Sequence, residues 1–112
     1  KSTIMNKIQN RVKLIGHLGA DPEIRSLESG RKVANFRIAT NSVYTNEKGE
    51  RKEDTQWHPI VAWGKLAEIS EEHLTKGKKV AIEGKLVHRT YETKDGDKRY
   101  VTEILCDELM ML

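Results

Sequence analysis

The sequence predicts an all-β domain with one helix, built as a five-stranded Greek-key barrel. Three observations support this fold class. Five segments alternate apolar and polar residues with the period of a strand, and turn residues separate them. One amphipathic segment, residues 65–76, has the period of a helix instead. It lies between the third and the fourth strand, which is the order of elements in a small Greek-key barrel.

Length and charge indicate one small domain. The chain has 112 residues, enough for a modest core, and carries 20 Lys and Arg against 17 Asp and Glu. The resulting net charge of +3 permits a polyanionic partner without requiring one. We expect residues 10–112 to form the single domain and residues 1–9 to be an N-terminal extension. Within it, Met5 is interpreted as the native start and residues 1–4 as a cloning remnant.

Cysteine content and hydropathy bear on the location of the protein. Cys106 is the single cysteine, which excludes an internal disulfide and fits a reducing compartment. No apolar run approaches the length of a membrane span, and no signal-peptide pattern is present. We therefore expect a cytoplasmic protein without a membrane partner.

The first two predicted strands, residues 10–18 and 32–44, each have one apolar face that should point into the core. A short extended piece, residues 23–27, lies between them. The apolar faces consist of Val12, Leu14, Gly16 and Leu18 in the first strand and Ala34, Phe36 and Ile38 in the second.

The third strand, residues 55–63, contains both tryptophans of the chain. Trp57 and Trp63 have the same parity, so both indoles should project from one face of the strand. Two flat rings on one strand face suggest a platform on which something flat can stack. Pro59 interrupts this strand and predicts an edge, a bulge or a barrel corner there. The polar segment before the strand, residues 45–54, is predicted to be a mobile hairpin loop.

The helix and the last two strands complete the pattern. The helix, residues 65–76, should end at Gly77, a residue typical of helix C-termini. The fourth strand, residues 78–91, should point Leu86 inward together with Val80 and Ile82. The fifth strand covers residues 98–109, after an Asp-Gly hairpin turn. Five strands with one helix between the third and the fourth are the plan of the OB-fold.

No catalytic or metal-binding motif is present. The four histidines are scattered along the chain, and one cysteine cannot form a thiolate metal site. The sequence has no HExxH, CxxC, nucleophile elbow or Gly-rich phosphate loop. We therefore expect no metal, no cofactor and no enzymatic activity. A metal-dependent nuclease would need clustered carboxylates, which the sequence does not supply.

Aromatic and basic residues on the strands favour a binding function. A ring can stack on an unpaired base, at about 1–3 kcal/mol per base, while Lys and Arg neutralise the phosphates. Duplex DNA hides its base faces, so exposed rings favour single strands. The candidate rings are Tyr44, Trp57, Trp63 and Tyr91, and the cations near them in the sequence are Arg37, Lys52, Lys65 and Arg89.

Each of these residues also has a plainer interpretation. A single aromatic residue on a strand belongs to the core more often than to a ligand site, and Trp63 beside Gly64 could plug the barrel end. Surface lysines usually serve solubility alone. Two alternative functions therefore stay open: an RNA-binding OB domain, and a structural OB module that serves protein assembly. The binding interpretation depends on several rings and cations converging on one sheet face.

At the level of motifs, the chain resembles the bacterial single-stranded DNA-binding proteins of the replication type. The resemblance rests on the segments NRVKLIGHLGADPEIR, VANFRIAT, TQWHPIVAWGKLAEISEEHLTKG, VAIEGKLVHRTYE and DGDKRYVTEIL. They occur in order and at the family's spacing from Asn10 nearly to the end of the chain.

The resemblance implies an OB-fold homotetramer that wraps single-stranded DNA without sequence preference in replication, recombination and repair. It also implies a bacterial, nucleoid-associated protein. The family's stacking positions correspond to Tyr44, Trp57, Trp63 and Tyr91. Its phosphate contacts correspond to Arg11, Arg25, Lys52, Lys65, Lys76 and Arg89, and His58 corresponds to a subunit-interface position.

Three departures from the family pattern affect these expectations. Tyr44 and Tyr91 stand where some relatives have Trp, so the stacking area should be smaller. Pro59 and Val87 occupy places that are often basic, so phosphate contacts should be fewer. The sequence ends at Leu112 without the family's acidic-tipped tail, so replication and repair proteins are expected as partners only if such a tail exists beyond that residue.

Overall fold

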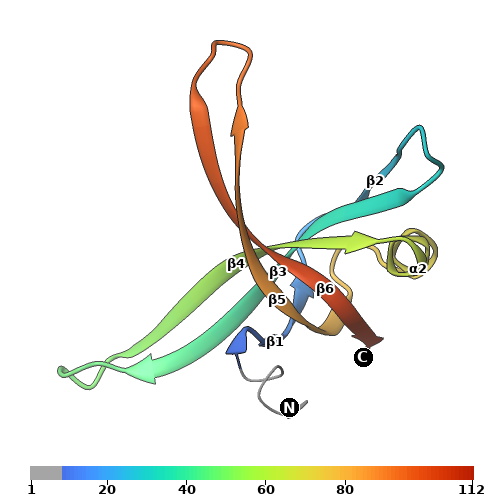
Figure 1. Cartoon of the computed structure of the whole chain (residues 1–112). Helices are drawn as coiled ribbons and strands as arrows, with labels where there is room; N and C mark the ends of the chain where they lie inside the picture. Colours follow the sequence, from blue (N-terminus) through green and yellow to red (C-terminus); the bar gives the residue numbers. More distant parts are fainter. Residues whose placement is uncertain (1–8) are drawn as a thin grey trace.

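The computed structural model describes residues 9–112; the predicted N-terminal extension falls, except for Gln9, outside the described residues. The described part contains six strands and one helix (Figure 1). In chain order these are β1 (Val12–Leu18), β2 (Glu23–Ser26), β3 (Lys32–Thr45), β4 (Arg51–Trp63), α2 (Lys65–His73), β5 (Lys79–Glu92) and β6 (Lys98–Met111).

The strands form one sheet that closes into a barrel. Their order is β1-β5-β6-β4-β3-β2, and β1 also pairs with β3 at its C-terminal end, where Leu18 lies opposite Ile38. This second pairing joins β1, β5, β6, β4 and β3 into a closed five-stranded barrel, and β2 extends β3 outside it. The helix α2 follows the third barrel strand and precedes the fourth. The predicted OB-fold is therefore confirmed.

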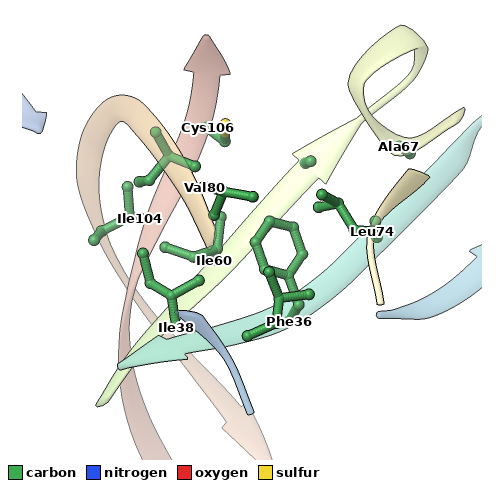
Figure 2. Close-up of a cluster of buried hydrophobic side chains, with 12 residues drawn as sticks. Phe36, Ile38, Ile60, Ala67, Leu74, Val80, Ile104 and Cys106 are labelled. Atoms are coloured by element: carbon green, nitrogen blue, oxygen red, sulfur yellow. The ribbon is translucent and has the colours of Figure 1, made fainter. Parts of the chain in front are cut away.

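The barrel core contains the apolar faces that alternation predicts. Phe36 and Ile38 on β3 meet Ile60 on β4, and Val80 and Ile104 approach from β5 and β6 (Figure 2). Ile38, Ile60 and Val80 are among the largest fully buried side chains. Ala67 on α2 and Leu74 directly after it belong to the same cluster, so the helix covers one part of the barrel.

Two hairpins extend well beyond the barrel: β3–β4 in green and β5–β6 in orange and red (Figure 1). The predicted mobile loop at residues 45–54 is wrong in its length, because β3 runs to Thr45 and β4 already begins at Arg51. Polar side chains do not disturb the ladder of an exposed two-stranded ribbon. The remaining turn is ordered by Asn46, whose Oδ1 accepts the backbone N–H groups of Lys48 and Glu50.

Two further predictions on this half of the chain are corrected. The helix α2 ends at His73. Gly77 (φ +87°) instead belongs to the turn that follows, and its backbone N–H donates to the carbonyl of Leu18. Leu86 lies opposite the buried Ile104 and has the parity of a core residue, but it is 43% exposed and not part of the core. The reason is that Leu86 lies where β5 leaves the barrel, since from Lys85 onward this strand has no buried residue.

Candidate nucleic-acid interface

The outer face of β3 and β4 carries both tryptophans. Trp57 lies opposite Ala39 and Trp63 opposite Val33, and the register between these pairs is unbroken. Because side chains alternate along a strand, both indoles project outward from one face of β4, as their spacing predicts. Trp57 is 52% exposed and Trp63 is half-buried. Neither ring is sealed inside the barrel.

Two adjoining concavities lie over this face. One, of about 420 Å³, is beside Trp63, and the other, of about 510 Å³, is beside Trp57. Both are lined by Asn35 and Glu103, so they adjoin, and we call the two together the groove. Its floor is the outer face of β3 and β4, and residues of β2, β5 and β6 line it as well. Figure 1 shows the β2–β3 and β5–β6 hairpins diverging from this part of the barrel.

Three of the predicted cations line the groove. Arg25 on β2 and Arg89 on β5 border the part beside Trp63, and Arg37 on β3 borders the part beside Trp57. Arg89 is held in place by Glu103, since its Nε donates to the carboxylate at 2.7 Å. This contact raises the pKa of Arg89. It also neutralises the carboxylate of Glu103, which is largely buried in the groove lining. The carboxylates of Asp21 and Glu23 also line the part beside Trp57, so the groove presents its three guanidinium groups beside carboxylates, of which Glu103 is paired with Arg89.

The two tyrosines occupy different places. Tyr91 has the same parity on β5 as the groove residues Val87 and Arg89, and the guanidinium carbon of Arg89 lies 5.9 Å from its ring centroid. Tyr44 lies on the β3–β4 hairpin opposite Lys52. The unbroken register gives it the parity opposite to that of the groove face, so it does not share a ribbon face with Trp57.

The other predicted cations do not line the groove within residues 9–112. Lys65 is exposed at the start of α2, and Lys76 is exposed in the turn after it. Arg11 makes a bidentate contact with Asp107, at 2.7 and 2.9 Å, and lies 3.1 Å from Glu83. The structure therefore uses Arg11 to tie the start of β1 to β5 and β6.

The Arg11–Asp107 pair predicts a pH-dependent stability. Arg11 lowers the pKa of Asp107, so the pair stabilises the fold above the ordinary carboxyl pKa and loses its effect as pH falls through the lowered pKa. We expect Asp107→Asn to lower the urea midpoint at about pH 7 and to lower it less at acidic pH, below the ordinary carboxyl pKa of about 4. The exposed Glu28→Gln serves as control. An equal loss at both pH values would contradict the assignment.

Sequence reasoning missed four residues of the groove region. Gly19 packs against Trp57: a Cβ at this position would lie 2.5 Å from the indole Cζ3. Arg31 places its guanidinium carbon 4.7 Å from the ring centroid of Trp63. Asn35 and Glu103 line both parts of the groove. Their parity on β3 and β6 could have indicated this face, but the contacts of Gly19 and Arg31 depend on the tertiary structure.

His58 lies on the other face of β4, next to the core. It is half-buried, and its Nε2 is 2.8 Å from the hydroxyl oxygen of Thr40. Among residues 9–112, no group of three or more His, Cys, Asp or Glu side chains is arranged to hold a metal ion. No helix in the described part of the chain has the length and apolar character needed to cross a membrane.

The sequence matches a known family over almost its whole length. The model of the single-strand binding protein family matches residues 9–112. The chain is 51% identical over 104 residues to single-stranded DNA-binding protein 1 of Chlorobaculum tepidum and 44% identical over 103 residues to the single-stranded DNA-binding protein of Neisseria meningitidis. Each match covers 92% of this chain but only 64% and 59% of those relatives. The chain thus spans less than two thirds of their length.

Solved structures give the same similarity at the level of the fold. The chain resembles a Plasmodium falciparum SSB in complex with ssDNA, with a TM-score of 0.84, 34% identity, and coverage of 92% of this chain and 94% of that one. It also resembles a deletion mutant of the single-stranded DNA binding protein from Thermus aquaticus, with a TM-score of 0.81, 31% identity, and coverage of 92% and 50%.

Proposed function

Because the chain belongs to the single-strand binding protein family, we propose that it binds single-stranded DNA without sequence preference, by binding alone and without catalysis. One observation carries the proposal: the groove combines two outward indoles with three arginines. Indole rings stack on any unpaired base, because every base has a π-face, and guanidinium groups neutralise the backbone. Sequence-tolerant affinity follows from this chemistry.

The proposal assigns roles to the individual residues. Trp57, Trp63 and Tyr91 stack bases along the groove, and Tyr44 stacks a base farther out on the β3–β4 hairpin. Arg25, Arg37 and Arg89 hold phosphates along the groove, while Lys52, Lys65 and Lys76 hold them outside it. Arg11, which is already paired with two carboxylates, is the weakest candidate for a phosphate contact.

We further propose that the domain, residues 10–112, assembles as a homotetramer. Ile15 and Met110 are 57% and 63% exposed on the outer face of β1 and β6, beside a shallow cavity of about 300 Å³. An exposed apolar surface of this kind is typical of a protein interface. His58 belongs to a subunit contact in this proposal. Analytical ultracentrifugation tests the assembly, and a monomer at micromolar concentration would contradict it.

The cellular setting is part of the same proposal. A protein that protects single-stranded DNA acts where strands are separated, in replication, recombination and repair. We therefore propose a cytoplasmic, nucleoid-associated location. Replication and repair proteins are partners of the whole protein if an acidic segment follows Leu112.

A fluorescence titration with oligothymidylate tests the function. We expect the tryptophan emission to be quenched, because bases stack on Trp57 and Trp63. The affinity should fall with salt at a log–log slope of about −0.7 per neutralised phosphate, hence about −4 for the six cations that the proposal assigns to phosphates. Unchanged emission would favour the assembly module instead. A competing RNA strand of equal length that binds more tightly than the DNA would favour the RNA-binding alternative.

Gly19→Ala tests whether the packing of the Trp57 ring against Gly19 matters for binding. The new Cβ would lie 2.5 and 2.8 Å from two indole carbons, so the ring must move. We expect the affinity for oligothymidylate to fall about three- to tenfold, a part of the 1–3 kcal/mol of one stacked base. The control is a double-mutant cycle with Trp57→Ala, in which the effect of Gly19→Ala should vanish. Additive losses would contradict this explanation.

A further inference from the structure

Arg31 occupies an ordered position in the turn between β2 and β3. The turn is closed by backbone hydrogen bonds: Leu27 N–H donates to the carbonyl of Arg31 at 2.8 Å, and Gly30 N–H donates to that of Leu27 at 2.9 Å. Gly30 has a φ of +89°, which glycine adopts without strain. The backbone that carries Arg31 is therefore fixed relative to β3, whose outer face forms part of the groove floor.

The side chain of Arg31 reaches Trp63. Its guanidinium carbon lies 4.7 Å from the ring centroid, within the range of a cation–π contact. The groove beside Trp63 is lined by the indole but not by Arg31, so the guanidinium lies over the ring without lining that part of the groove. A planar guanidinium stacks on an aromatic face and restrains the ring against which it lies. Trp63 is thus held in position with the groove side left open.

The charge of Arg31 is not used by an ion pair within residues 9–112. Two other cations of this region are paired. The Nζ of Lys32 is 2.7 Å from Oε1 of Glu71, and the Nε of Arg89 in the groove is 2.7 Å from Oε1 of Glu103. Arg31 is also exposed. Several of its N–H donors therefore remain for an anionic ligand while the guanidinium carbon stays over the indole.

We propose that Arg31 is a further single-stranded-DNA-contacting residue, which restrains the Trp63 indole so that one base stacks on its groove side and which also binds the phosphate next to that base. The inference deepens the proposed function and rests on it. The phosphate is recognised by its charge and the base by its π-face, so the contact carries no base preference.

The test compares Arg31→Ala and Arg31→Met with Lys79→Ala. All three remove one positive charge, and Met keeps an unbranched side chain over the ring. Lys79 is exposed at the end of β5 farthest from Arg89, where it serves as the charge-matched control. Each variant is made in a Trp57→Phe background, in which the emission reports Trp63 alone. Each is titrated with oligothymidylate at several salt concentrations.

We expect both Arg31 variants to bind about three- to tenfold more weakly at low salt and to reduce the salt slope by about 0.7, while the Lys79 variant changes neither. Quenching at saturation should fall in Arg31→Ala and be partly retained in Arg31→Met. If the parent protein binds and the Arg31 variants titrate like Lys79→Ala, the role of Arg31 is overturned while the proposed function stands. If the parent shows no salt-dependent binding, the proposed function itself fails, and the role of Arg31 with it.

Discussion

Replacing Trp57 with alanine is expected to weaken oligothymidylate binding about 5- to 150-fold, which corresponds to the 1–3 kcal/mol that one stacked base contributes. The ring is 52% exposed on the groove face, so its loss removes a stacking surface and little of the core. Titration of the remaining Trp63 emission, at two salt concentrations, measures the effect. The salt slope should stay nearly unchanged, because the groove arginines are intact.

Two variants make this result specific. Trp57→Phe keeps a ring and should recover most of the affinity. Tyr100→Ala removes a ring that is 81% exposed on β6 but has the parity opposite to that of the groove residue Glu103. We expect it to bind as the unchanged protein does. If Tyr100→Ala lost as much affinity as Trp57→Ala, the groove would not be the place where bases stack.

Replacing Ile60 with alanine should lower the free energy of unfolding by about 2–5 kcal/mol, because it opens a cavity in a closed core. Ile60 is 1% exposed and lies among side chains from four barrel strands (Figure 2). Urea unfolding followed by circular dichroism measures the loss. Val43→Ala, at a position that is 48% exposed on the β3–β4 hairpin, is the control and should cost under about 0.5 kcal/mol. Equal losses would contradict the assignment of the core.

Alternation was sufficient to predict the barrel and one face of the groove. Ala34, Phe36 and Ile38 are buried, and their neighbours on β3 point outward, because a strand has only two faces. The same rule placed Trp57 and Trp63 together. These predictions succeeded because they depend on local geometry, which the sequence contains directly.

Predictions that depended on where an element ends were less accurate. The helix was extended to Gly77 because a glycine near a helix end usually terminates it, but here that glycine docks on β1. Leu86 has the parity of a core residue but lies where β5 has already left the barrel. Arg31 could not be predicted, since its contact with Trp63 arises only when the β2–β3 turn folds beside the end of β4.

The closure of the barrel has a consequence for how the chain folds. β1 pairs with β5, so that Val12 lies opposite Gly84. β6 pairs with β4 in parallel and places Ile104 beside Ile60, which is more than 40 positions earlier in the chain. Such a topology has a high contact order, and we expect refolding in milliseconds to seconds, slower than in helical domains. The two long hairpins pair residues close in sequence and should form early. During translation, the apolar faces of β1 and β3 remain uncovered until β5 and β6 have left the ribosome.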